Sequence, residues 1–146
     1  MKEHEDSARR QLDTLDRAEC MMLLATVPVG RVAYCVQGRP HIEVINYVVD
    51  DGTVLIRMAA SDKSVAVERG GHFALEADRL DTVNGTGWNV TVIGPVAWIT
   101  EPSAIQRALR LVHAWAPGEK LCFARISAEH VFGRRLREIA APPAHP

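Results

Sequence analysis

The chain has 146 residues, the length of one ordinary domain, and 47% of them are hydrophobic, so it can bury a substantial core. Its 17 Lys and Arg residues against 18 Asp and Glu residues give a formal net charge of −1. This balance excludes the broad basic surface typical of proteins that bind nucleic acid or anionic membranes.

The apolar stretches, the N-terminus and the cysteines indicate in which cellular compartment the protein is expected. The apolar stretches are shorter than the roughly 20 residues that a membrane helix needs, and the charged N-terminus does not resemble a secretion signal. Three widely spaced cysteines show neither metal-ligand spacing nor an even count. We therefore expect a cytoplasmic protein without a membrane segment, a disulfide framework or a metal site.

The N-terminal part of the chain predicts an arm followed by a helix. Residues 1–14 are polar and charged, and we interpret them as a solvated arm or frayed helix. Asp16 and Glu19 have the spacing of a capping box, in which each side chain accepts a hydrogen bond from the other's backbone amide. The helix that follows is expected to run to about Ala25, before Pro28 and Gly30.

The next segment predicts three antiparallel strands joined by tight turns. Runs rich in β-branched residues occupy 31–36, 41–49 and 53–58, and turn residues separate them at 37–40 and 50–52. A short helix is expected over 62–69, with Ser61 or Asp62 as its N-cap.

The second half predicts three more strands and a third helix. The strands are expected at 73–78, 88–99 and 121–126, and the helix at about 101–113. Gly94 and Pro95 interrupt the long strand, as at the corner of a barrel. The predicted fold is therefore α+β, mainly β, with a six-stranded antiparallel barrel over residues 15–137, flanking helices and a Pro-rich tail over 138–146.

One segment has the residue types of an anion site. Arg57 ends an apolar strand, and Ser61 and Lys63 stand in the first turn of the next helix. A hydroxyl, two cations and the free amides of a helix start could together hold a phosphate. The alternative is structural: Ser61 is then only a helix cap, and the two cations are solvated.

Two strands could contribute to a pocket. Strand alternation places Trp88 on one face and Asn89 and Thr91 on the other, where an amide and a hydroxyl could meet a planar heterocycle. Asn46 and Tyr47 could line a pocket mouth just before a turn. The same residues also fit a core Trp, a solvated strand face and a barrel rim.

Familiar catalytic motifs are missing from the sequence. It contains no HExxH, GxSxG, GxGxxG or GxxxxGK[ST] pattern, and its six histidines show no paired spacing. The catalytic residues are therefore unknown, and any reactive group is expected to belong to a bound cofactor.

The order of several short motifs resembles the pyridoxamine 5′-phosphate oxidase-like family of FMN-binding split barrels, especially its short actinobacterial members. The resemblance covers about residues 15–136. The motifs that carry it are Leu23–Ala33, Gly38–Pro40, Asn46–Tyr47, Asp51–Gly52, Ile56–Arg57, Ser61–Lys63 and Thr86–Val90.

This resemblance implies a homodimer with two FMN molecules in clefts between the subunits. The positions that match the family's phosphate-binding residues are Arg57, Ser61 and Lys63. The strand beside the isoalloxazine ring corresponds to Val44, Ile45, Asn46 and Tyr47. Trp88 and Asn89 are implied to reach the flavin or its ribityl chain, from the partner subunit or nearby.

The function implied is an FMN-dependent oxidoreductase that acts on an unknown small-molecule substrate. True pyridoxamine phosphate oxidases carry a C-terminal segment with Arg and His that holds the substrate phosphate, and this chain ends differently. We therefore do not expect vitamin B6 oxidation. The alternatives are a reductase that uses a deazaflavin of the F420 type and a non-catalytic module that binds flavin or haem.

Overall fold

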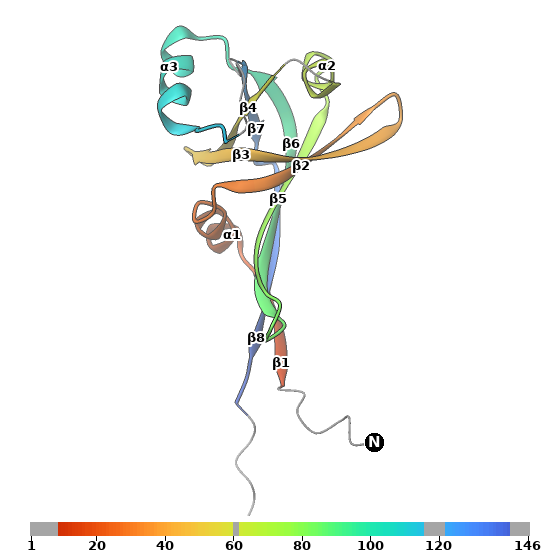
Figure 1. Cartoon of the computed structure of the whole chain (residues 1–146), viewed down its shortest axis with the longest axis vertical. Helices are drawn as coiled ribbons and strands as arrows, with labels where there is room; N and C mark the ends of the chain where they lie inside the picture. Colours follow the sequence, from red (N-terminus) through yellow and green to blue (C-terminus); the bar gives the residue numbers. More distant parts are fainter. Residues whose placement is uncertain (1–8, 60–61, 116–121, 141–146) are drawn as a thin grey trace, which may run out of the picture.

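The computed structural model describes residues 9–59, 62–115 and 122–140, which form eight strands and three helices (Figure 1). The helices are α1 (Arg17–Leu24), α2 (Asp62–Glu68) and α3 (Pro102–Leu111). The strands are β1 (Arg10–Leu15), β2 (Val29–Val36), β3 (Arg39–Asp50), β4 (Thr53–Met58), β5 (His72–Asp81), β6 (Thr86–Trp98), β7 (Cys122–Ser127) and β8 (His130–Glu138).

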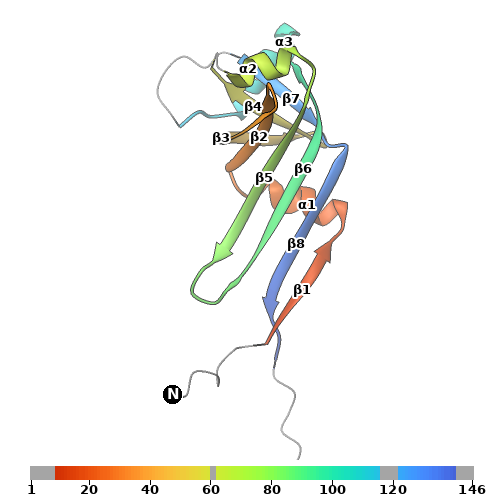
Figure 2. The ribbon, with the colours of Figure 1, turned by 90° about the vertical axis from the view of Figure 1, so that its right-hand side faces the viewer.

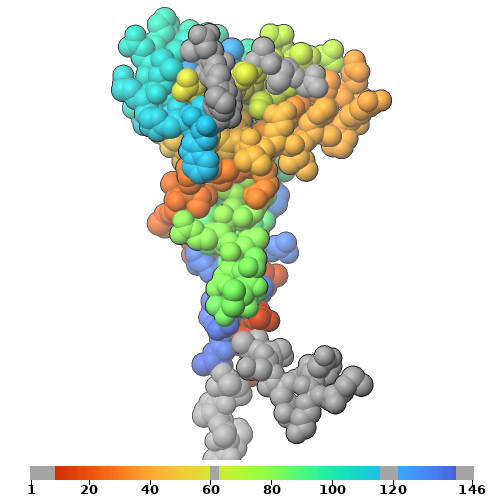
Figure 3. Space-filling view, in the orientation of Figure 1, coloured from red at the N-terminus to blue at the C-terminus, as the bar shows by residue number. Residues whose placement is uncertain are grey.

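Six of the strands close into an antiparallel barrel. Their order is β6-β5-β2-β3-β4-β7, and β7 pairs again with β6. These six are the strands predicted from the sequence, so the predicted fold class is confirmed. On the other side of β6, β8 and β1 continue the sheet as two extra strands. Figure 2 shows β5, β6, β8 and β1 side by side below the barrel, and Figure 3 shows this lower part as narrower than the barrel.

The barrel closes at a corner in β6. Up to Ile93 this strand pairs with β8, and from Val96 it pairs with β7. The turn that joins β7 to β8 crosses directly over Gly94, where an added Cβ would lie only 1.7 Å from the Ser127 carbonyl oxygen. Gly94 and Pro95 thus mark a barrel corner, as predicted, and only a residue without a side chain fits at Gly94.

Two tight turns fix the register of β2, β3 and β4. Gln37 and Gly38 have φ of 51° and 74°, and Asp51 and Gly52 have φ of 49° and 72°. Two successive residues with positive φ are typical of two-residue hairpin turns, whose twist matches that of the strands. These turns connect β2 to β3 and β3 to β4, as predicted.

Helix α1 closes one end of the barrel core. Its capping box is confirmed: the Asp16 carboxylate accepts from the Glu19 amide at 2.8 Å, and the Glu19 carboxylate accepts from the Asp16 amide at 3.3 Å. Cys20 and Leu24 on its inner face are fully buried. They join the large core cluster inside the barrel, whereas α3 packs over a smaller cluster around Leu55 and Phe123.

The N-terminal prediction is wrong in one respect. Residues 10–14 belong to β1, which pairs along its whole length with β8, and neither strand was predicted. The pairing continues through a hydrogen bond from the Ile139 amide to the Arg9 carbonyl. Because β1 is an edge strand with mostly exposed polar side chains, it lacks the apolar alternation that reveals a strand in a sequence.

None of the helices in the described residues is long and apolar enough to cross a membrane. The tail beyond residue 140 lies outside the described residues.

The barrel corner gives a test of the fold. Gly94→Ala should lower the free energy of unfolding by about 3 kcal/mol, because the new methyl group overlaps the Ser127 carbonyl. Denaturation with urea measures the change. Gly71→Ala is the control, since its Cβ would lie 3.7 Å from the nearest heavy atom, and it should change stability by less than about 1 kcal/mol. Equal effects of the two substitutions would contradict the close approach at Gly94.

Candidate functional site

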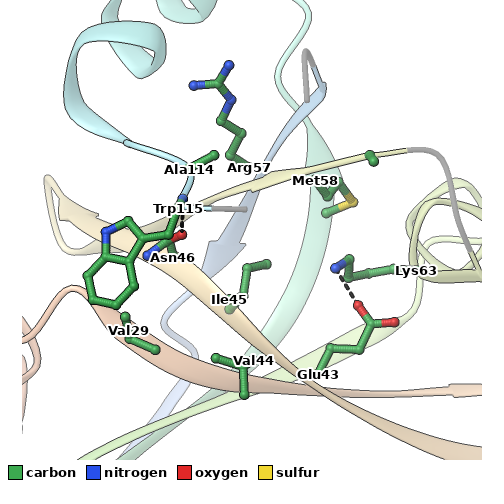
Figure 4. Close-up of a pocket in the computed structure, with 11 residues that line it drawn as sticks. Val29, Glu43, Val44, Ile45, Asn46, Arg57, Met58, Lys63, Ala114 and Trp115 are labelled. Carbon is green, nitrogen blue, oxygen red and sulfur yellow. Dashed lines mark hydrogen bonds and ion pairs between the residues drawn. The ribbon is translucent and has the colours of Figure 1, made fainter. Parts of the chain in front are cut away.

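A pocket of about 490 Å³ lies where β3, the end of β4, the start of α2 and the segment after α3 meet (Figure 4). Its lining residues are Val29, Glu43, Val44, Ile45, Asn46, Arg57, Met58, Ala59, Lys63, Ala114 and Trp115. Most of these side chains are apolar, and Glu43, Arg57 and Lys63 are the ionisable side chains among them. The pocket thus combines an apolar surface with a few charged groups, as small-molecule sites commonly do.

The pocket brings together five residues that the sequence singled out. Arg57 and Lys63 come from the segment that leads from β4 into α2, and Val44, Ile45 and Asn46 come from β3. Ser61, the third predicted phosphate ligand, lies outside the described residues. α2 has only seven residues, so its N-terminus alone is not an argument for an anion site. The argument for an anion site here depends on the side chains of Arg57 and Lys63.

Lys63 is buried, with 8% of its surface exposed, and its ammonium forms an ion pair with the Glu43 carboxylate. Figure 4 shows the two side chains pointing toward each other from α2 and β3. On the other side of the carboxylate, the Tyr34 hydroxyl donates to Glu43 Oε1 at 2.8 Å. Burial raises the pKa of Glu43, but the hydrogen bonds from Lys63 and Tyr34 outweigh burial and hold this pKa below its ordinary value.

Arg57 lines the same pocket but has other neighbours. Its guanidinium lies over the Phe123 ring, 5.5 Å from the ring centroid, and Nη1 donates to the Val112 carbonyl at 3.4 Å. In Figure 4 its head group points away from Lys63. The structure therefore places both predicted cations at one pocket, but their charged ends do not converge on one point.

Asn46 connects the pocket wall to the segment after α3. Its side-chain oxygen accepts a hydrogen bond from the Trp115 amide at 2.9 Å, and its Nδ2 donates to the Pro28 carbonyl at 3.4 Å. The Trp115 side chain is 70% exposed at the pocket edge. Asn46 thus fixes the backbone at Trp115, whose exposed side chain lies at the pocket edge.

The expectation that Tyr47 lines the pocket mouth is corrected by the structure. Tyr47 is 3% exposed, lies in the barrel core and donates from its hydroxyl to the Leu24 carbonyl at 2.6 Å. Burial also raises its pKa above the ordinary tyrosine value. The physical reason is its place along β3, because Ile45 on the same face of the strand lines the pocket, whereas Tyr47 lies further along, beside the end of α1. There it lines a smaller cavity of about 230 Å³ together with Leu24 and Pro28.

Trp88 and Asn89 lie elsewhere in this chain. They line a second cavity of about 620 Å³ on the sheet below the barrel, together with Leu12, Leu80 and Leu136. Trp88 is 8% exposed and belongs to the core cluster, whereas Asn89 is partly exposed. Within one chain, therefore, these two residues do not reach the pocket that contains Lys63.

The second cavity also contains a close pair of carboxylates. Glu76 and Asp78 lie two residues apart on one face of β5, and Arg31 pairs with both, at 3.4 and 3.1 Å. Burial raises the pKa of Glu76 to about 7, and the neighbouring Asp78 carboxylate adds to the rise. Glu76 is thus a candidate proton-binding group that sequence reasoning missed.

Two further residues of the first pocket were missed. Glu43 interrupts the apolar pattern between Ile42 and Val44, and this interruption was the available signal. Trp115 follows α3 without a distinctive pattern, and only the fold brings it to β3. Among the described residues, no group of three or more His, Cys, Asp or Glu side chains could hold a metal ion.

Comparison with known proteins identifies a family and a relative that match most of the chain. A family model described as pyridoxamine 5′-phosphate oxidase matches residues 16–141. The uncharacterized protein Rv0080 of Mycobacterium tuberculosis is 38% identical over 132 residues, and the match covers 87% of this chain and 87% of that one.

Two solved structures are also similar. An FAD-binding protein from Mycobacterium smegmatis is 27% identical with a TM-score of 0.68, covering 87% of this chain and 100% of that one. An FAD-binding protein from Mesorhizobium loti has a TM-score of 0.73 over 89% of this chain and 100% of that one, and at 20% identity it supports the fold alone.

The raised pKa of Glu76 predicts a pH dependence of stability. Because the folded state binds this proton more tightly than the unfolded chain, stability should fall as the pH rises from about 4.5 to about 7. We expect a loss of about 1–3 kcal/mol in the free energy of unfolding between pH 4.5 and 8, measured with urea.

Glu76→Gln is the matched variant for this prediction. Its free energy of unfolding should decrease much less than that of the wild type between pH 4.5 and 8. Glu43 and Asp50 have lowered pKa values, so their contributions change mainly below this pH window. An equal decrease in the wild type and in Glu76→Gln would rule out Glu76 as the source.

Proposed function

Because the chain belongs to the pyridoxamine 5′-phosphate oxidase family, we propose that it binds FMN in the pocket between β3 and α2 and acts as a flavin-dependent oxidoreductase. The proposed substrate is a small molecule other than pyridoxamine 5′-phosphate. The observation that carries the proposal is the presence of Lys63 and Arg57 at one pocket with an apolar wall.

The residues of the pocket fit a flavin nucleotide. Its volume of about 490 Å³ lies within the range of small-molecule sites. An ammonium and a guanidinium are the donors that suit a phosphate, and Val29, Val44 and Met58 offer an apolar surface to a ring system. A bound flavin would supply the redox chemistry, for which this chain shows no catalytic motif of its own.

The form of the nucleotide is a separate part of the proposal. The resemblance in the sequence favours FMN, whereas the similar protein from Mycobacterium smegmatis is described as FAD-binding. FAD is therefore the second candidate. Both nucleotides offer a phosphate group to Lys63 and Arg57.

A second copy of this chain is the proposed partner. Direct pairing across the sheet places Val44, Arg31, Glu76, Thr91 and Phe132 in one row, so their side chains share one face. Five large apolar side chains on this face are 54–73% exposed: Ile42, Val44, Leu12, Leu80 and Phe132. Exposed apolar groups gathered on one face are typical of a protein interface.

The proposed dimer would also explain the separation of the predicted flavin contacts. Val44 belongs both to the pocket with Lys63 and to this exposed face. Trp88 and Asn89 line the second cavity, which opens on the same sheet. A partner that covers this face could therefore bring its own Trp88 and Asn89 toward the flavin.

The flavin proposal is tested by the absorption spectrum and by titration. Purified protein loaded with FMN should show two flavin bands that bleach with dithionite. Lys63→Ala and Arg57→Ala should each weaken FMN binding by about 1–3 kcal/mol, because each removes a charged phosphate donor.

Arg69→Ala is the matched control, since Arg69 is exposed at the end of α2 and does not line the pocket. Its affinity for FMN should equal that of the wild type. Unchanged FMN affinity in both pocket variants would refute the phosphate assignment. A Soret band would indicate haem, and tighter binding of FAD than of FMN would replace FMN by FAD in the proposal.

The dimer is tested by light scattering. The wild type should have the mass of two chains, and Phe132→Asp should shift it toward the mass of one, because a carboxylate is then buried in an apolar contact. Met22→Asp is the control: Met22 is 66% exposed on α1, which packs on the opposite face of this sheet, and this variant should remain dimeric. A monomeric wild type loaded with FMN would contradict the proposal.

A further inference from the structure

The ammonium of Lys63 already has an anionic partner inside the pocket. Lys63 and Asp50 are the charged residues that the described part of the chain buries most, and Lys63 is paired with Glu43. A phosphate that enters the pocket must therefore either share this ammonium with Glu43 or displace the carboxylate. An ammonium has three donors, so sharing is possible, but the two anions then lie close together and repel each other.

Glu43 is held in place by Tyr34, which contacts the carboxylate oxygen that does not pair with Lys63. The Tyr34 hydroxyl that donates to Glu43 belongs to a side chain that is only 3% exposed. The Tyr34 ring is stacked between His41, at 5.1 Å, and Phe73, at 5.2 Å. Because Tyr34 cannot move without disturbing the core, it anchors the Glu43 carboxylate in place, although 38% of the Glu43 side chain is exposed.

Glu43 also keeps its charge at neutral pH. The hydrogen bonds from Lys63 and Tyr34 hold its pKa below the ordinary glutamate value despite burial. A phosphate monoester carries almost two negative charges near pH 7. At neutral pH, the pocket therefore contains a permanent negative charge beside the cation that its anionic ligand needs.

We propose that Glu43 is a specificity-determining residue that competes with the ligand phosphate for Lys63 and so limits the preference of the pocket for phosphorylated ligands. This inference rests on the proposed flavin site. It assigns a role to a residue that the motif of Arg57, Ser61 and Lys63 does not include. Without this carboxylate, the same pocket should favour a phosphate-bearing ligand more strongly.

The decisive measurement compares FMN with riboflavin, which has the same ring and ribityl chain but no phosphate. The ratio of the riboflavin Kd to the FMN Kd isolates the contribution of the phosphate. In Glu43→Gln this ratio should rise roughly five- to tenfold, because the amide keeps the size of the side chain and an acceptor for Tyr34 but removes the charge. An unchanged ratio would overturn the proposal. A lower ratio would also overturn it, since Glu43 would then position Lys63 for the phosphate.

Two controls separate competition at Lys63 from a general effect of charge. Glu68→Gln removes an exposed carboxylate from α2, outside the pocket, and should leave the ratio unchanged. In the background of Lys63→Met, Glu43→Gln should raise the ratio much less, because the contested ammonium is gone. A full rise in that background would contradict competition for Lys63.

Tyr34→Phe covers the case in which Glu43→Gln does not fold. This variant keeps both charges and removes only the hydroxyl that anchors Glu43. The carboxylate could then withdraw when phosphate binds, so the ratio should rise in the same direction but by less. Circular dichroism establishes that each variant is folded, and an unchanged ratio in folded Tyr34→Phe would count against the proposal.

Failure of the flavin proposal can be distinguished from failure of the role proposed for Glu43. If the wild type binds neither FMN nor riboflavin, the probe becomes inorganic phosphate, measured by the rise in Tm that it produces. A larger rise in Glu43→Gln than in the wild type would retain the role of Glu43 and reject the flavin. No larger rise in the variant would overturn the role of Glu43 as well.

Discussion

The closure of the barrel at one corner of β6 is the constraint on which the candidate site depends. Gly94 lets the turn between β7 and β8 cross the strand, so that β6 pairs with β8 on one side of the corner and with β7 on the other. Closure then sets β4 between β3 and β7. As a result, the end of β4 and the start of α2 bring Arg57 and Lys63 beside β3, and the segment after α3 completes the pocket.

The net charge of the chain is close to zero, but individual charged side chains are arranged in specific ion pairs. Buried or half-buried charges occur in matched groups: Lys63 with Glu43, and the pair Glu76 and Asp78 with Arg31. Asp50, at the turn from β3 to β4, accepts hydrogen bonds from Arg107 on α3, which lower its pKa and tie this helix to the barrel. Such pairing reduces the cost of burying a charge, and it also makes each cation less available to an external anion. The chemistry of the pocket is therefore set by the balance of neighbouring charges more than by the number of cations.

Local features were predictable because their causes are local. The capping box of Asp16 and Glu19, the two hairpin turns and the six barrel strands all follow from residues close in the sequence. β1 and β8 were missed because their pairing joins segments more than 100 residues apart, and polar side chains on an edge strand leave no apolar period. Tyr47 was misplaced for a related reason. Ile45 and Tyr47 share one face of β3, and only the fold decides that the pocket includes Ile45 and stops before Tyr47.

The sequence by itself determined the fold class, the six strands of the barrel and the closeness of Arg57 to Lys63, which are six residues apart. Only the tertiary structure decided what surrounds these cations. It set Glu43 against Lys63, turned Arg57 toward Phe123, held Trp115 at the pocket edge and moved Trp88 and Asn89 to another cavity. The reason is that electrostatic and packing partners are chosen by distance in space. In a closed barrel, that distance is fixed by strand pairing between segments far apart in the chain.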